Sequence, residues 1–312
     1  MKNTLLTLSY FIITALTFGQ VISPEYYNLV AKAESLYIAK NYKASAFSFS
    51  AAFGSNHGDG TVYNKFDAAC AWTLANYPDS AFFTLEEIVA KYNFNEYEDV
   101  HISTNSNLNP LHNDKRWKSL LETIKRNEDK AERSLNKPLA AELDSIYTED
   151  QKYRLMIDSI RKRSGQDSKE MKDLWKIINE KDSINLVKTT TILDKYGWLG
   201  TDVVGVKGNA ALFLVIQHSK LKIQEHYLPM MKEAVKNGKA LGSQLALLVD
   251  RIEMRNERPQ IYGSQLQMKD GKYGFYQIVD EINVNKRRAE VGLQPLEEYA
   301  RYFNIEYKLP SK

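Results

Sequence analysis

The heptapeptide NYKASAF at residues 41–47 recurs as NYPDSAF at residues 76–82, 35 residues later in the chain. Two further pairs match at the same offset, Ala33 with Ala68 and Tyr37 with Trp72. Small residues at repeated positions let two helices approach closely, and the aromatic residues fill the space beside them. Each copy therefore predicts a helix, a short turn and a second helix, over residues 24–40 and 42–53, then 61–75 and 79–92.

This pattern resembles the tetratricopeptide family, whose repeat is close to this length. The Asn-Tyr turn and the following Ala-Phe fit the start of the second helix of that repeat, whereas the Trp and Gly marks of its first helix are not clean. A third, degenerate unit is predicted over residues 95–126. The resemblance implies stacked helical hairpins with a groove for a protein or peptide, and a helical spacer without a ligand is the alternative.

The composition excludes several classes of protein. The chain has 312 residues, 26% of them charged and 43% hydrophobic, which is typical of a globular protein of about two domains. Its 42 basic and 39 acidic residues give a net charge of +3, so a dedicated nucleic-acid binder is not expected. The single cysteine, Cys70, cannot form an internal disulfide, and we interpret it as a small buried apolar residue.

The first 19 residues have the layout of a secretory signal peptide. Lys2 precedes an apolar run over residues 5–16, and Thr17 and Gly19 occupy the −3 and −1 positions of a cleavage site. The run is shorter than the roughly 20 residues that span a bilayer. We therefore predict export to the periplasm or beyond the cell, with no stable membrane insertion after cleavage.

A charged amphipathic helical region follows over residues 113–163, and Pro138 marks a joint within it. We place the domain limits accordingly: a signal peptide over 1–19, the tetratricopeptide-like domain over 20–130, a charged linker over 131–142, a helical domain over 143–303, and a tail over 304–312.

The second domain is predicted to be mainly helical. Ser168 is expected to cap a helix that runs to Lys195, and Gly197 ends it. A glycine-spaced loop is predicted over 197–208, with Asn209 capping the next helix over 210–218. Further helices are predicted over 227–237, 244–254, 284–291 and 296–303. Asp270-Gly271 predicts a β-hairpin within 264–278. The predicted fold is therefore mainly α, with helical-hairpin repeats followed by a mostly helical domain that contains one small β-hairpin.

A set of polar motifs in this domain resembles a bacterial family of unknown function. They are Asp150-Gln151-x-x-Arg154, Asp182-x-x-Asn185, Tyr196-Gly197-Trp198, Gln217-His218, Asp250-Arg251, Gln260-x-Tyr262-Gly263-x-Gln265, and Asn285-x-Arg287-Arg288-x-x-Val291-Gly292-Leu293. The resemblance covers roughly residues 143–303. It implies a fold and a set of polar residues, but no assigned reaction.

Phosphate-loop and metal signatures do not match. Gly200 and Gly205 have the spacing of the two glycines of a phosphate-binding loop, but Val206-Lys207-Gly208 follows instead of Lys-Ser or Lys-Thr. The five histidines include no His-Glu-x-x-His motif, and His218 and His226 are eight residues apart. We predict neither a metal nor a cofactor.

Two hypotheses use the remaining polar residues. In the preferred hypothesis the protein is a non-enzymatic binding protein with a small polar ligand in its C-terminal domain. The expected contacts to this ligand are Gln217, Gln260, Tyr262, Gln265 and Arg287, which offer amides, an aromatic face and a bidentate guanidinium.

In the alternative, the protein is a cell-envelope hydrolase. His218 is then the general acid or base, Asp250 its partner, and Arg251 the group that stabilises negative charge. Both hypotheses compete with a purely structural role, in which His218 is a satisfied core residue and Asp250 and Arg251 form an ion pair.

Overall fold

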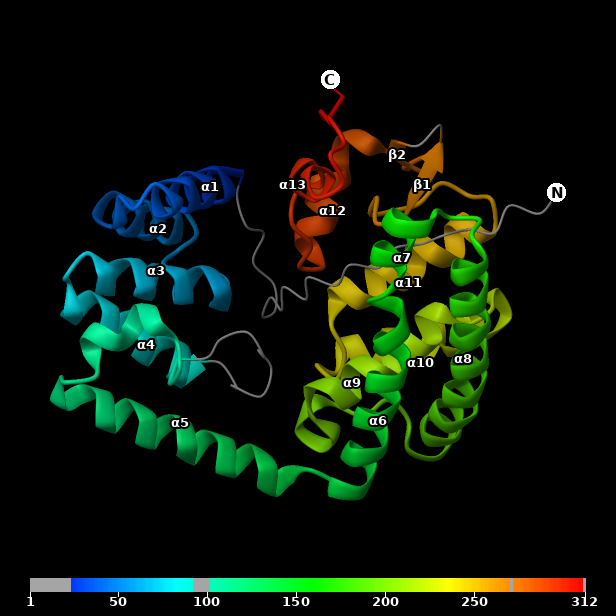
Figure 1. Cartoon of the computed structure of the whole chain (residues 1–312), viewed down its shortest axis with the longest axis horizontal. Helices are drawn as coiled ribbons and strands as arrows, with labels where there is room; N and C mark the ends of the chain where they lie inside the picture. The colour runs from blue at the N-terminus through cyan, green and yellow to red at the C-terminus, as the bar shows by residue number, and fades with distance from the viewer. Residues whose placement is uncertain (1–23, 92–101, 270–271, 311–312) are drawn as a thin grey trace. The chain divides into compact units, whose positions relative to one another are not determined.

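The computed structural model describes residues 24–91, 102–269 and 272–310, so the predicted signal peptide lies outside the described residues. The predicted fold class is confirmed: the described chain is mainly α-helical, with one two-stranded antiparallel sheet (Figure 1). It forms two compact units, one reaching Arg133 and the other starting at Ser134, apart from residues 292–295. Within the described ranges, no helix is both long and apolar enough to cross a membrane.

The N-terminal unit is built from two helical hairpins and a longer helix. Its elements are α1 (Pro24–Ile38), α2 (Tyr42–Ser55), α3 (Val62–Leu74), α4 (Pro78–Lys91), the 3₁₀ helix η2 (Ser106–Leu111) and α5 (Lys115–Ser134). α1 packs on α2, α3 packs on α4, and α2 also contacts α3. The Asn41 side chain accepts a hydrogen bond from the Ala44 amide at 3.3 Å and so caps α2.

The repeated small residues lie where these helices touch. Ala33, Ala46, Ala68 and Ala81 are all fully buried. The repeated phenylalanines differ, because Phe82 is buried whereas Phe47 is half exposed and packs its ring edge-on against Trp72, with 5.0 Å between ring centroids. The helical hairpins are thus observed, while membership of the tetratricopeptide family remains a prediction.

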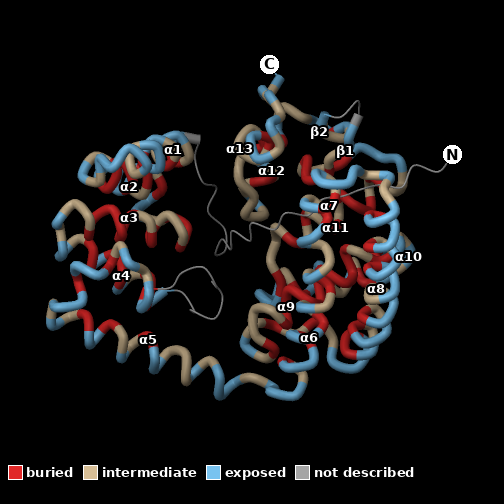
Figure 2. Tube along the Cα trace, viewed as in Figure 1, coloured by how far each residue is buried: buried red, intermediate tan, exposed pale blue. Residues whose placement is uncertain are grey.

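The C-terminal unit is organised around one apolar helix. Its elements are α6 (Lys137–Arg154), α7 (Ile157–Ser164), α8 (Lys169–Tyr196), α9 (Thr201–His218), α10 (Leu221–Lys236), α11 (Gly242–Arg255), β1 (Leu266–Lys269), β2 (Lys272–Phe275), η3 (Glu281–Asn283), α12 (Val284–Glu290) and α13 (Leu296–Arg301). α9 contacts α6, α8, α10 and α11. Its residues 208–217 are all buried, as expected for a helix that is apolar on every side (Figure 2).

The start of α9 corrects two predictions. The helix begins at Thr201 and continues through a kink at Gly205, whose φ of +72° is accessible to glycine, so residues 201–208 do not form a loop. Asn209 therefore lies inside α9 and does not cap it. Its side-chain amide donates to the carbonyl oxygens of Leu199 and Lys239, both at 2.7 Å, so acceptors distant in the sequence satisfy it.

Most other local signals correspond to observed elements. The Ser168 hydroxyl accepts from the Met171 amide at 3.2 Å and caps α8, and Gly197 ends that helix with a φ of +69°. α10 begins at Leu221, six residues before the predicted start, and contains Pro229. In the hairpin, Leu266 pairs with Phe275, whereas the turn residues 270–271 lie outside the described residues.

Candidate functional site

Asp250 on α11 organises a loop. One carboxylate oxygen accepts from the backbone amides of Ile261 at 2.7 Å and Tyr262 at 2.9 Å, and the other accepts from that of Ser264 at 2.8 Å. Asp250 is fully buried. Burial raises its pKa, while the backbone donors favour the ionised form and oppose that shift. The carboxylate therefore holds the loop over residues 260–265 and makes no contact with His218.

The two glutamines of the Gln260-x-Tyr262-Gly263-x-Gln265 segment complete this loop. The Gln260 side-chain amide donates to the carbonyls of Gln265 at 3.1 Å and Tyr276 at 3.0 Å, and its oxygen accepts from the Gln265 amide at 2.8 Å. Gly263 turns the chain with a φ of +70°. Gln260 is therefore committed to backbone groups, and Tyr262 takes part through its own backbone.

Arg287 also supports this region. It donates to the carbonyls of Ile261 at 2.9 Å and Asp280 at 3.1 Å, and forms an ion pair with the Asp280 carboxylate at 3.2 Å. Its donors thus tie two loop segments together. This arrangement leaves Arg287 a structural role, although the sequence suggested contact with a ligand.

His218, at the end of α9, joins a separate charged network. Its Nδ1 lies 3.0 Å from a carboxylate oxygen of Asp150 and 3.1 Å from Nε of Arg154, both residues of α6. Arg154 also contacts Asp182 of α8 at 2.6 Å. Asp150, and not the predicted Asp250, is therefore the carboxylate beside His218, and Gln151 donates to Asp150 at 2.7 Å.

The charges in this network can be assigned. Burial lowers the pKa of His218 below its usual value, with Asp150 opposing the shift, so the imidazole is neutral at pH 7. Burial alone would raise the pKa of Asp150, but His218 and Arg154 bring it well below its usual range. Nδ1 of His218 thus meets two groups at once, the Nε–H of Arg154, which donates, and the Asp150 carboxylate, which can only accept.

Arg251, the next residue after Asp250, lies in the interior. It is 3% exposed, and its Nε donates to the side-chain oxygen of Gln265 at 2.9 Å. Its Nη1 lies 3.5 Å from the carbonyl oxygen of Gln217, which also accepts from the Gln224 side chain at 2.7 Å. Both partners of Arg251 are neutral, and none of the ion pairs within the described residues includes this guanidinium.

Other arginines surround this buried charge. Burial, followed by the charges of Arg255 and Arg154, lowers the pKa of Arg251 to about 9, so it remains protonated at pH 7. Arg255 donates to the Ser219 carbonyl and likewise has no carboxylate partner in the described part of the chain. The interior between α9 and α11 therefore carries positive charge that the described carboxylates do not neutralise.

Comparison with known proteins places this unit in a family. A family model described as a family of unknown function (DUF6624) matches residues 139–312. The chain belongs to this family. No curated protein and no solved structure matches the chain. The predicted resemblance to a family of unknown function is thereby confirmed at the level of the family, whereas its individual motifs and the N-terminal repeats remain predictions.

Within the DUF6624 unit, the predicted site residues form two groups, which Gln265 connects. The first group forms or holds the 260–265 loop and comprises Asp250, Gln260, Tyr262 and Arg287. The second group lies at the end of α9. There Arg251 contacts the Gln265 side chain and the carbonyl of Gln217, and His218 is the next residue in the sequence. Site prediction from the sequence omitted Asp150, Arg154 and Asp182, although all three belong to the motifs that carried the resemblance. The i,i+4 spacing of Asp150 and Arg154 was the available signal, but their meeting with α8 and α9 is tertiary.

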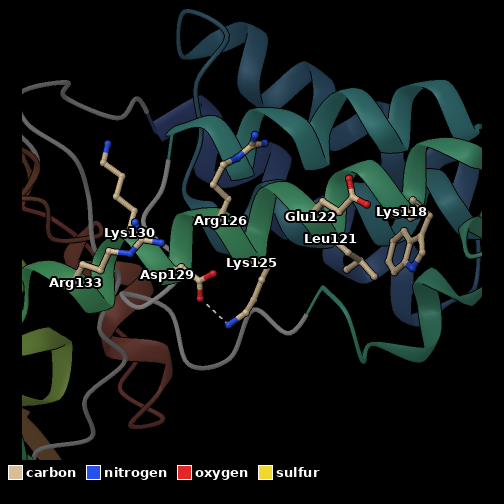
Figure 3. Close-up of a pocket in the computed structure, with 9 residues that line it drawn as sticks. Lys118, Leu121, Glu122, Lys125, Arg126, Asp129, Lys130 and Arg133 are labelled. Carbon is tan, nitrogen blue, oxygen red and sulfur yellow. Dashed lines mark ion pairs between the residues drawn. The ribbon is translucent and has the colours of Figure 1, made fainter.

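The N-terminal unit has a hollow of its own. A space of about 770 Å³ lies along α5 (Figure 3). The described residues that line it are Trp117, Lys118, Leu121, Glu122, Lys125, Arg126, Asp129, Lys130 and Arg133. Five of these nine are cationic, and Asp129 is paired with Lys125 at 2.7 Å. This hollow contains none of the site residues predicted from the sequence.

Proposed function

We propose that the protein is an exported binding protein whose DUF6624 unit takes up a small anion, a phosphate or a carboxylate, beside Arg251. The observation that carries this proposal is the buried guanidinium of Arg251, with which no carboxylate of the described residues pairs. An ion buried in a protein costs several kcal/mol unless an opposite charge accompanies it. A bound anion would provide that charge and accept two hydrogen bonds from the planar guanidinium.

The neighbouring residues support an anion over a neutral polar ligand. The carboxylates of Asp150 and Asp182 are engaged by Arg154, so they do not neutralise Arg251 or Arg255. Gln265 holds Nε of Arg251, and Ser264 in turn accepts from the Gln265 side chain at 3.0 Å. The guanidinium is thereby fixed in one orientation before a ligand arrives, which reduces the entropic cost of binding.

The hydrolase alternative now rests on Asp150 in place of Asp250. Asp150 lies 3.0 Å from Nδ1 of His218, and an imidazole that donates to this carboxylate would accept a proton at Nε2, as a general base does. Ser219 is not its nucleophile, because the Ser219 hydroxyl donates to the Val215 carbonyl at 2.7 Å. Water would then be the nucleophile. We favour binding because the buried charge of Arg251 calls for an anion whether or not a reaction follows.

Replacing Arg251 with methionine is expected to abolish anion binding without destabilising the free protein. In wild type, an anion at a hundred times its Kd adds about 2.7 kcal/mol to the free energy of unfolding. That corresponds to a rise in Tm of roughly 5–10 °C. The Arg251→Met variant should show no such rise, and its stability without anion should be unchanged or higher by up to about 2 kcal/mol. Calorimetry with inorganic phosphate and with citrate measures both effects.

Arg287→Met is the matched control. It removes a guanidinium that binds loop carbonyls, so it should lower Tm but preserve the rise with anion. The proposal is wrong if neither anion stabilises the wild type, or if Arg251→Met behaves like Arg287→Met. Hydrolysis of a phosphate monoester that is lost in His218→Asn would instead make this site catalytic.

We also propose that the N-terminal unit takes up an acidic peptide along α5. The observation in favour is the excess of cations around the hollow, together with the apolar surface that Leu121 contributes. A fluorescent peptide of alternating Glu and Leu is a suitable probe. Replacing both Arg126 and Lys130 with Glu, which reverses their charge, should weaken binding of the peptide at least tenfold. The same replacement at Lys32 and Lys40, exposed residues outside the hollow, should leave binding unchanged. Equal effects of the two double variants would contradict the proposal.

A further inference from the structure

The outer face of α8 carries an exposed apolar stripe. The inner face of this helix packs into the core through Leu174, Ile178 and Leu193, among others. On the opposite side, Ile177, Ile184 and Val187 are 40%, 46% and 66% exposed. Figure 2 shows α8 exposed along its outer side for much of its length. Three large apolar side chains thus remain in solvent on one helix.

The spacing of these residues is that of a helix-pairing seam. Ile184 follows Ile177 by seven residues, Val187 follows Ile184 by three, and Thr191 follows Val187 by four. Alternating steps of three and four residues keep side chains on one face, as in helices that pair along a common seam. All four positions are exposed, so the seam is open to a second helix.

The charges on the same stripe specify the partner and its direction. Asp173 and Glu180 lie toward the start of α8, whereas Lys188 and Lys195 lie toward its end. Glu180 and Lys188 are each four residues from Ile184, and Asp173 and Lys195 are each eleven residues from it. All four side chains are exposed, and the ion pairs within the described residues include none of them.

A two-fold axis at Ile184 would bring these charges together. In an antiparallel pair of α8 helices, Glu180 of each copy would face Lys188 of the other, and Asp173 would face Lys195. A parallel pair would set each charge against its own kind. A two-fold contact uses the same surface twice, so one self-complementary stripe suffices.

We propose that two copies of this chain associate through an antiparallel pairing of their α8 helices, centred on Ile184. The apolar residues provide the attraction, and the four charges select the direction. This association is independent of the anion site. Because the seam holds only three large apolar side chains per copy, the dimer is expected to be reversible.

Sedimentation equilibrium over 5–200 µM tests the pairing. Wild type should show a monomer–dimer equilibrium, and Ile184→Glu should raise the dissociation constant at least tenfold because it sets two carboxylates against each other at the axis. Glu180→Lys and Lys188→Glu should each weaken the dimer about tenfold, and the double variant should restore it. These residues are exposed, so the circular dichroism melting curves should not change. A monomeric wild type, or a double variant weaker than either single one, overturns the proposal.

Cysteine cross-linking tests the direction independently. In an antiparallel pair only a residue at the axis faces its own copy, so Ile184→Cys should form an intermolecular disulfide and Ile177→Cys should not. In a parallel pair both would cross-link. The natural Cys70 is buried in the other unit and is replaced by Ser in both variants. Equal cross-linking of the two variants rules out the antiparallel arrangement.

Discussion

Replacing Asp250 with alanine is expected to lower the free energy of unfolding of the C-terminal unit by about 3–5 kcal/mol. The substitution removes the shared acceptor of three backbone amides, those of Ile261, Tyr262 and Ser264. Water has poor access to these groups, because Asp250 is fully buried. The loop over residues 260–265 would lose its anchor to α11, so Tm should fall by roughly 8–15 °C.

The Asp250→Asn variant removes the negative charge of the side chain but keeps its shape, so it separates these two contributions to stability. The amide keeps one oxygen acceptor, so this variant should lose less stability than Asp250→Ala. Asp158→Ala, which removes a partly exposed carboxylate from α7, is the surface control and should cost at most about 1 kcal/mol. Chemical denaturation of the three variants gives the comparison. If Asp250→Ala costs no more than Asp158→Ala, the loop does not depend on this carboxylate.

Gly263→Ala is expected to cost about 2–4 kcal/mol for two reasons that add. The φ of +70° at Gly263 strains a residue with a side chain by about 1 kcal/mol. A Cβ at this position would also lie 2.9 Å from Cδ1 of Ile278 and 3.0 Å from Cδ1 of Leu296, both buried, and such overpacking costs about 1–3 kcal/mol. Urea denaturation measures the total.

Gly165→Ala isolates the backbone part of that effect. Gly165 has a φ of +88°, and a Cβ there would meet no atom within 4 Å. Its φ of +88° and ψ of 161° lie in a region that is essentially restricted to glycine, so its replacement should cost about 1–3 kcal/mol from the backbone alone. The difference between the two variants measures the packing around Gly263. Equal losses would show that Ile278 and Leu296 move aside without cost.

Local signals in the sequence account for most of the helices. The steps of three and four between apolar residues predict them, and caps such as Ser168 and Asn41 act within four residues of the chain. The start of α9 is where this reasoning failed. Glycines at 200, 205 and 208 suggested a loop, yet the chain is helical on both sides of a kink at Gly205, and α9 as a whole packs among four other helices.

The candidate site depended far more on tertiary structure. Sequence adjacency suggested that Asp250 and Arg251 act together, but consecutive residues on a helix point about 100° apart. Asp250 therefore faces the 260–265 loop, and Arg251 faces Gln217 and Gln265. Only the packing of α6 and α8 against α9 brings the Asp150–Arg154 pair of α6 together with Asp182 and His218.

The sequence by itself thus determined the mainly helical fold class and the small hairpin, because periodicity, capping and turn residues act over a few neighbouring residues. The tertiary structure alone decided which carboxylate meets His218, and that none of the described carboxylates pairs with Arg251. These pairings join helices tens of residues apart, and they depend on which side of each helix turns toward the core.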